Sequence, residues 1–229
     1  MLLADQLPSL MSAGLQRVNI SLDTLSEATF QRLSRREGLH RVLEGVAAAV
    51  AMPDLKVKLN ALVLRDVNLS DVFELVQFAK DRDIPLRFIE FMPLDGQRSW
   101  TRDRMVSGRE LRDLLSQRFG PLVSLPGVDP SQPSSDYEFV NGGRVGFIDS
   151  VTKPFCGSCD RLRLTADGRV RNCLFGREEW DVAELLRAQH AAQDIQRVVR
   201  SAVAAKYASH GIADPDFQPP ERAMYQIGG

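Results

Sequence analysis

Cysteine is absent from residues 1–155, and the whole chain holds only three cysteines and three histidines. Thiolates and imidazoles are the ligands that hold zinc and iron–sulfur clusters in proteins. Any such site in this chain must therefore draw on a small set of side chains. Three cysteines without a secretory signal favour a reducing compartment.

Three further absences exclude other classes of protein. No run of 18 apolar residues is present, so the sequence predicts no membrane-spanning helix. The opening residues lack a basic stretch and include Asp5, which is not the pattern of a signal peptide. The formal net charge of −1 argues against bulk electrostatic attraction to nucleic acid. We therefore expect neither a membrane nor nucleic acid as a partner of this globular chain of 229 residues.

All the cysteines of the chain lie close together in the sequence. Cys156, Cys159 and Cys173 have the spacing C-x2-C-x13-C. Thiolates that share a site repel one another and need cations nearby, so this motif indicates a metal or iron–sulfur site. The motif supplies such cations at Arg161, Arg163, Arg169 and Arg171.

The residues between the cysteines have the pattern of a β-hairpin. Leucines alternate with arginines over residues 161–164, and Gly168 can close a three-residue loop. This register places Leu164 opposite Val170, Arg163 opposite Arg171 and Arg161 opposite Cys173. We expect these arginines and Cys173 to share one face, where guanidinium groups would suit a phosphorylated substrate.

The number of cysteines leaves the identity of the metal open. Zinc would need a fourth protein ligand, and the chain offers only His40, His190 and His210. An iron–sulfur cluster with three cysteine ligands would leave one iron free to bind a substrate atom. A structural zinc knuckle and a C-x2-C redox pair stay as alternatives, although the redox pair leaves Cys173 unexplained.

The first part of the chain alternates between strand and helix patterns. This order predicts βαβ units on a parallel sheet, which bind ligands at the carboxyl ends of their strands. The expected strands are residues 17–22, 55–64 and 85–91. After the first strand we expect a helix that Thr24 or Ser26 caps, and then helices at residues 39–52 and 70–82. Lys58 and Asn60 interrupt an apolar strand, so we expect both side chains to point into the mouth of the sheet. Ser21 and Asp23 fit either a ligand site or a turn with a helix cap.

A different organisation begins after Met92. We expect a helix at residues 107–119, a loop at 120–135, a hairpin at 137–148, and helices at 181–190 and 193–210. The chain ends in Gly228 and Gly229. Met224, Tyr225 and Ile227 offer anchors for this tail, but the pattern alone favours a frayed end.

Five stretches, in this order, resemble the radical S-adenosylmethionine GTP 3′,8-cyclases of molybdenum-cofactor biosynthesis (the MoaA family). They are RVNISLDTL, KVKLNALVL, LRFIEFMPL, FCGSCDRLRLTADGRVRNCLF and the terminal IGG. The resemblance implies an α/β fold with an incomplete (β/α) radical-SAM barrel over residues 1–100. A smaller α+β C-terminal domain that carries the cluster and binds GTP would follow over residues 101–229.

The resemblance also assigns roles to individual residues. Cys156, Cys159 and Cys173 would ligate a [4Fe–4S] cluster whose open iron meets the guanine base. The residues expected to line the GTP site are Lys58, Arg87, Arg161 and Arg163, of which Arg161 and Arg163 are also the catalytic candidates. Ser21 would contact S-adenosylmethionine, and the tail residues Gly228 and Gly229 would reach into the active site.

The chain departs from the family pattern in one respect. The family has an N-terminal C-x3-C-x2-C motif whose cluster cleaves S-adenosylmethionine, and no cysteine precedes Cys156 here. We therefore expect a truncated chain that does not turn over GTP alone and that leaves the strand at residues 17–22 as an uncovered sheet edge. The alternative is a non-catalytic iron–sulfur, zinc or nucleotide-binding module.

For the complete enzyme, the resemblance implies radical chemistry on GTP. A deoxyadenosyl radical takes a hydrogen atom from the ribose, and the sugar carbon attacks C8 of guanine. The product, 3′,8-cyclo-GTP, leads to cyclic pyranopterin monophosphate, so the synthase of that compound would be a downstream partner. A homodimer stays open, and we expect a cytoplasmic location, or the mitochondrial matrix in a eukaryote.

Overall fold

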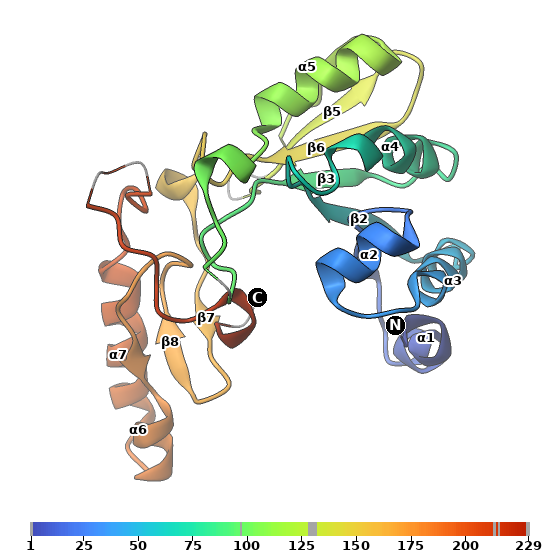
Figure 1. Cartoon of the computed structure of the whole chain (residues 1–229). Coiled ribbons are helices and arrows are strands. Elements are labelled where there is room, and N and C mark those ends of the chain that lie inside the picture. Colours follow the sequence, from blue (N-terminus) through green and yellow to red (C-terminus); the bar gives the residue numbers. More distant parts are fainter. Residues whose placement is uncertain (1, 97, 128–131, 213, 215, 228–229) are drawn as a thin grey trace. The chain divides into compact units, whose positions relative to one another are not determined.

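The computed structural model describes residues 2–96, 98–127, 132–212, 214 and 216–227 (Figure 1). The chain forms two compact units. The first, which we call the sheet unit, comprises Met1–Phe91 and Arg102–Thr152. The second, the cysteine unit, comprises Met92–Thr101 and Lys153–Gly229. These units are defined by packing, so the predicted domain division at residue 100 stays a prediction.

The sheet unit is built on a mixed six-stranded sheet with the order β1-β2-β3-β6-β5-β4. The strands are β1 (Arg17–Ser21), β2 (Lys56–Leu62), β3 (Leu86–Ile89), β4 (Leu122–Ser124), β5 (Ser135–Phe139) and β6 (Arg144–Ile148). Strands β1, β2, β3 and β6 are parallel, and β5 and β4 continue the sheet in antiparallel fashion. The predicted α/β class and parallel sheet are confirmed, whereas the incomplete barrel stays a prediction.

The helices of the sheet unit begin and end largely where the sequence indicates. They are α1 (Leu3–Ser12), α2 (Glu27–Ser34), α3 (Leu39–Val50), α4 (Val72–Lys80) and α5 (Gly108–Phe119), with short 3-10 turns η1 (Leu69–Asp71) and η2 (Arg102–Arg104). Ser26 caps α2 by accepting a hydrogen bond from the Thr29 amide, and Ser107 caps α5 by accepting one from Glu110. These caps satisfy amides that a helix start would otherwise leave unpaired.

The two faces of this sheet differ sharply in character. Side chains alternate between the faces along each strand, and one set packs with α1, α3, α4 and α5 into a single apolar core. That set includes Ile20, Leu59, Phe88 and Phe147. The register places the other set on the opposite side, which we call the polar face. Its members include Asn19, Ser21, Lys58, Asn60, Arg87, Asp136 and Gly146.

Strand β1 ends the sheet on one side, because β2 is its neighbour in the sheet order and no strand of the described residues lies beyond it. The expected edge strand is therefore seen, while its effect on solubility stays a prediction.

At the opposite edge, β4 lies in a stretch that we predicted to be a loop. That prediction was wrong, because Leu122 and Ser124 pair with Phe139 and Tyr137. Among the described helices, none combines the length and the apolar composition that crossing a bilayer requires.

The cysteine unit contains a three-stranded antiparallel sheet with the order β7-β8-β9. Its elements are η3 (Cys156–Ser158), β7 (Arg163–Leu164), β8 (Arg169–Arg171), β9 (Trp180–Asp181), α6 (Ala183–Arg187), α7 (Ala192–Ala204) and η4 (Met224–Gln226). The predicted hairpin register is confirmed, since Arg163 pairs with Arg171 and Leu164 with Val170. Gly168 closes the loop at φ 83°, a backbone conformation that favours glycine.

Three predicted helix boundaries in this unit were wrong, one of them the end expected at residue 190, because α6 ends at Arg187. The helix expected from residue 181 starts at Ala183, because Trp180 and Asp181 pair with β8 as strand β9. The helix expected to reach residue 210 ends at Ala204, where the Asn172 amide donates hydrogen bonds to the carbonyls of Ala202 and Ala205. The start of α6 and the end of α7 are therefore set by contacts with residues outside these helices.

The described part of the C-terminal tail is anchored in the cysteine unit. The Met224 amide donates a hydrogen bond of 2.9 Å to the Leu94 carbonyl, and Ile227 is fully buried against Leu94 and Phe175. Of the anchors that the sequence offered, Met224 and Ile227 do hold the chain, whereas the frayed end expected at the last two residues stays a prediction. Gly228 and Gly229, expected in the active site, lie outside the described residues.

Glu90 holds the segment after β6 against the start of α5. Its buried carboxylate accepts hydrogen bonds from the amides of Val151 (2.7 Å) and Thr152 (2.9 Å), the Thr152 hydroxyl (2.5 Å) and the Gly108 amide (3.3 Å). We expect Glu90→Gln to lower the free energy of unfolding by about 2 kcal/mol, because its NH2 group cannot accept the two hydrogen bonds that one carboxylate oxygen accepts. Urea unfolding measures this loss. The matched control Glu138→Gln, at an exposed position of β5, should leave the midpoint unchanged, and equal midpoints for both variants would contradict the role of Glu90.

Candidate functional site

The three cysteines come together in the cysteine unit from two directions. Cys156 lies in the single turn η3, which is closed by a hydrogen bond of 3.1 Å from the Cys159 amide to the Cys156 carbonyl. Cys173 follows β8 on the returning arm of the hairpin. All three are half-buried thiols that form no disulfide.

The three thiols share one electrostatic environment. Burial raises the pKa of the Cys156 thiol, and negative charge on Cys173 and Cys159 raises it further. The backbone amide of His210 donates to Cys156 and lowers its pKa in part. Within the described ranges, no three or more His, Cys, Asp or Glu side chains are grouped so that they could hold a metal ion. The proposal that the three cysteines ligate one metal site therefore stays a prediction.

The histidines test the zinc alternative. His40 is exposed in α3 of the other unit, and His190 is half exposed and 3.7 Å from Asp194. His210 lies next to Cys156, but its Nδ1 atom accepts a hydrogen bond of 3.1 Å from the Ile212 amide. A histidine that binds zinc through one ring nitrogen donates a hydrogen bond from the other. In His210 the Nδ1 atom accepts a hydrogen bond, so the proton lies on Nε2, and binding zinc would require the ring to change its tautomer or orientation. The observed orientation does not favour a site of three cysteines and His210.

The arginines of the hairpin fall into two groups, and the first is structural. Arg171 is 2% exposed and donates to Glu179 at 2.5 Å and to the carbonyl of Gly176. Arg169 lies 3.5 to 3.8 Å from the carboxylates of Asp167, Glu179 and Asp181. The expectation that Arg171 would face a substrate was therefore wrong, because its guanidinium is bound within the fold.

The second group, Arg161 and Arg163, lies on the cysteine side of the hairpin. The Arg161 guanidinium is 4.8 Å from the centre of the Phe155 ring. Burial lowers the pKa of Arg163, and the positive charge of Arg161 lowers it further, while Cys159 and Cys173 act in the opposite direction. These two cations and the thiols therefore act on one another, as the predicted site requires.

A network of ion pairs joins the tail to the hairpin, and the sequence analysis missed it. Arg222 donates to Asp167 at 2.7 Å and to Glu179 at 2.7 Å. Its guanidinium holds the pKa of the Asp167 carboxyl well below its usual range. No local pattern could have revealed these pairs, because the partners are separated by 55 and 43 residues.

The polar face of the sheet unit brings the other predicted residues together. Arg87 forms an ion pair of 3.0 Å with Asp136, and Asn60 lies opposite Arg87 in the parallel register. Burial lowers the pKa of Lys58, and the positive charge of Arg87 lowers it further. Ser21 is exposed at the end of β1, opposite Asn60. The prediction that Lys58 and Asn60 share this face is consistent with the register, whereas Asp136 was missed.

Gly146 leaves the space in which Arg87 and Asp136 meet. A Cβ atom at this position would lie 2.5 Å from Asp136 Oδ1, 3.0 Å from Arg87 Cγ and 2.4 Å from Ser134 Oγ. Real Cβ atoms do not approach other atoms so closely. The missing side chain therefore allows the three strands β3, β6 and β5 to present these groups side by side.

Asp23, one of the alternatives weighed at the end of β1, has a structural role. Its Oδ1 atom accepts a hydrogen bond of 2.7 Å from the Leu62 amide, and burial raises the pKa of its carboxyl. The next residue, Thr24, is fully buried and donates to Asp71 at 2.6 Å. The reading of this segment as a turn that leads into a capped helix is therefore correct.

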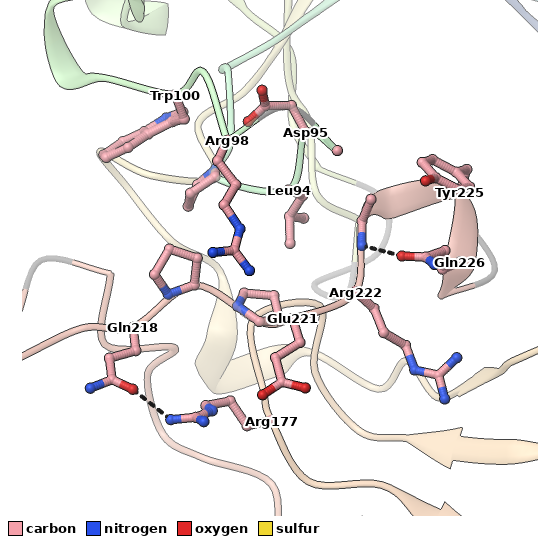
Figure 2. A pocket seen from close by; sticks show the side chains of 15 residues that line it. Leu94, Asp95, Arg98, Trp100, Arg177, Gln218, Glu221, Arg222, Tyr225 and Gln226 are labelled. Atoms are coloured by element: carbon pink, nitrogen blue, oxygen red, sulfur yellow. Dashed lines mark hydrogen bonds between the residues drawn. The ribbon is translucent and has the colours of Figure 1, made fainter.

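The cysteine unit also contains a pocket of about 400 Å³ between residues 93–100 and the tail (Figure 2). Figure 2 shows Arg98 reaching into it, with Trp100 on one side and Tyr225 on the other. Arg177 donates to Gln218 at 2.7 Å at its rim. A second pocket of about 530 Å³ opens beside Cys173 and His210. Among the three cysteines, Cys173 therefore lines a pocket.

Residues 84–212 match the sequence profile of a family described as Molybdenum Cofactor Synthesis C. The match includes β3 with Arg87, all three cysteines and both arginines beside them. This match covers more than half of the chain and therefore places it in a class of molybdenum-cofactor synthesis proteins.

Similar proteins identify the family further. A protein named GTP 3′,8-cyclase from Rhodopirellula baltica is 45% identical over 232 residues, which cover 100% of this chain and 65% of that protein. Proteins of the same name from Paenarthrobacter nicotinovorans and Streptomyces coelicolor are each 43% identical, over 99% and 96% of this chain and 68% and 65% of their own lengths. The chain spans about two thirds of the length of these relatives. It belongs to the GTP 3′,8-cyclase family.

Proposed function

We propose that this chain is the GTP-binding and cluster-binding part of a GTP 3′,8-cyclase of molybdenum-cofactor biosynthesis. The observation that carries the proposal is the alignment of the whole chain, at 45% identity, with a protein of that name. The proposal is supported by the cationic residues at the positions that the resemblance assigns to GTP: Lys58 and Arg87 in the sheet unit, and Arg161 and Arg163 in the cysteine unit. The roles below are proposals for individual residues.

In the sheet unit, Lys58 and Arg87 bind the anionic part of GTP. Burial and the positive charge of Arg87 lower the pKa of Lys58, and an anion bound beside the two cations offsets their repulsion. Asp136 fixes the Arg87 guanidinium through the ion pair at 3.0 Å, so that its orientation is set before the substrate arrives. Ser21, exposed at the carboxyl end of β1, contacts S-adenosylmethionine.

In the cysteine unit, Cys156, Cys159 and Cys173 hold a [4Fe–4S] cluster. Three thiols fit this group, because such a cluster can keep one iron free of protein ligands, and that iron is the site for the guanine base. Arg161 and Arg163 balance the negative charge of the thiolates and hold substrate beside them. The resemblance assigns substrate contact to Gly228 and Gly229, which directly follow the buried Ile227 in the sequence.

GTP binding by the purified chain tests this function. We expect Lys58→Met to weaken GTP binding about tenfold to a hundredfold, because a charge-assisted hydrogen bond contributes about 1.5 to 3 kcal/mol. Affinity should also fall as the pH rises through the lowered pKa of Lys58, since the deprotonated amine no longer attracts phosphate. Isothermal titration with GTP at several pH values measures both effects.

The matched control is Lys56→Met, which removes an exposed lysine from the start of the same strand. Its affinity for GTP should equal that of the unchanged chain at every pH. Equal losses in the two variants would show that the lysines act only through net charge, and the assignment of Lys58 to the GTP site would then fail.

The second prediction concerns turnover. The printed 229 residues contain one cysteine motif and no C-x3-C-x2-C, so we expect no conversion of GTP to 3′,8-cyclo-GTP by this polypeptide alone. Anaerobic incubation with GTP, S-adenosylmethionine and a reductant, followed by mass analysis of the nucleotides, measures this. Formation of 3′,8-cyclo-GTP above that of a heat-treated control would overturn the prediction.

A further inference from the structure

Lys206 lies just after α7 and binds both arms of the cysteine motif. Its ammonium donates hydrogen bonds to the carbonyl of Arg161 at 2.7 Å and to the carbonyl of Asn172 at 2.8 Å. Its Nζ atom is also 3.9 Å from the sulfur of Cys159. An ammonium has three N–H groups, and these three acceptors account for all of them.

The two carbonyls that Lys206 binds lie on opposite arms of the hairpin, each close to a cysteine in the sequence. Arg161 follows Cys159 by two residues, and Asn172 comes directly before Cys173. The paired strands of the hairpin begin only at Arg163 and Arg171, so the strand ladder does not extend to the cysteines. Lys206 therefore joins the two arms at the point where the strand hydrogen bonds end.

The link also runs in the other direction. The side-chain amide of Asn172 donates to the carbonyls of Ala202 and Ala205 at the end of α7. Asn172 is 2% exposed, so these hydrogen bonds lie in the interior of the unit. These hydrogen bonds connect the end of α7 to the residue before Cys173. They therefore also fix the position of Lys206, which follows α7.

We propose that Lys206 is a positioning residue for the cluster site. It sets the separation of Cys159 and Cys173 by holding the carbonyls of Arg161 and Asn172, and it places a positive charge beside the Cys159 sulfur. This inference rests on the proposed function, because the cluster is part of that proposal. Reduction adds an electron to a cluster, so a fixed cation beside a ligand sulfur stabilises the reduced form and raises the reduction potential.

The experiment compares the unchanged chain with Lys206→Met, Lys206→Arg and the control Lys153→Met, an exposed lysine of the same unit. Metal-free samples are analysed by hydrogen exchange, and anaerobically reconstituted samples by iron and sulfide content and by redox titration. Lys206→Met should exchange faster at residues 160–173 and should have a lower midpoint potential. Lys206→Arg, which keeps the charge, should restore the potential, and Lys153→Met should match the unchanged chain. If Lys206→Met does not fold, Lys206→Gln replaces it, because its amide keeps two donors without the charge.

The outcomes separate this inference from the proposed function. A cluster-bearing chain whose midpoint potential is the same with lysine, methionine or glutamine at residue 206 overturns the inference and leaves the proposed function standing. A chain that takes up no iron in any variant overturns the cluster part of the proposed function. In that case hydrogen exchange alone decides the positioning role, and equal rates at residues 160–173 overturn it.

Discussion

Replacing Cys173 with serine is expected to abolish the uptake of iron and sulfide by this chain. A cluster bound by three thiolates loses one of its three protein attachments, and a serine hydroxyl is a poor ligand for iron–sulfur clusters because it keeps its proton near neutral pH. Cys173 also reaches the site on its own arm of the hairpin, so no neighbouring thiol can replace it. Anaerobic reconstitution followed by iron and sulfide analysis and visible absorption measures the loss.

Ser158→Ala is the matched control, because it changes a hydroxyl within the turn between Cys156 and Cys159 and removes no thiol. It should take up iron and sulfide as the unchanged chain does. The same analysis distinguishes the zinc alternative: one zinc per chain, lost in Cys173→Ser and with no sulfide in any sample, would replace the cluster with a zinc knuckle.

Replacing Arg171 with methionine is expected to lower the free energy of unfolding by about 3 kcal/mol. Breaking a buried ion pair destabilises proteins by about 3 to 5 kcal/mol, because it leaves a charge that is neither solvated nor paired. The lower end applies here, since Arg222 continues to bind Glu179 after Arg171 is removed. The carbonyl of Gly176 loses its donor as well. Urea unfolding of the metal-free chain measures the loss.

Arg163→Met provides the comparison, because Arg163 occupies the paired position on the other arm of the same hairpin. We expect it to weaken GTP binding while leaving the unfolding midpoint close to that of the unchanged chain. If Arg163→Met were the more destabilising of the two, the division of the hairpin arginines into a structural and a substrate-facing group would be wrong.

The register of the cysteine hairpin could be predicted from the sequence because its determinants are local. The alternation of leucine and arginine fixes which side chains share a face, and Gly168 fixes the loop, so only one register satisfies both. The parallel strands β1 to β3 could be predicted for a similar reason. Each is a short run in which apolar residues alternate with polar ones, and a helix pattern follows after a turn.

What the sequence did not reveal depends on contacts between distant residues. Strand β4 has three residues and takes its conformation from β5, so its own pattern is too short to read. The structural role of Arg171 depends on its hydrogen bond to Glu179. The anchoring of the tail depends on the hydrogen bond from Arg222 to Asp167. In the sequence, a structural arginine and a substrate-binding arginine look alike, because only the partner distinguishes them.

The candidate site shows the same division. The expectation that Lys58 and Asn60 share one face followed from two polar residues in an apolar strand, and the register places both on the polar face of the sheet. Asp136 and Lys206 lie in a hairpin and beyond a helix, where an acidic or basic residue is ordinary. Their roles come from the residues that the fold brings beside them.

The burial of Ile227 has a practical consequence for work with this protein. Anything fused to the C-terminus, such as a histidine tag or a fluorescent reporter, would start two residues beyond a side chain with 0% exposure. A bulky fusion there would strain the hydrogen bond from Met224 to Leu94 and the packing beside Cys173. Purification handles are better placed before α1, where Leu2 is 54% exposed, and iron uptake or GTP binding by a C-terminal fusion should be compared with that of the unmodified chain.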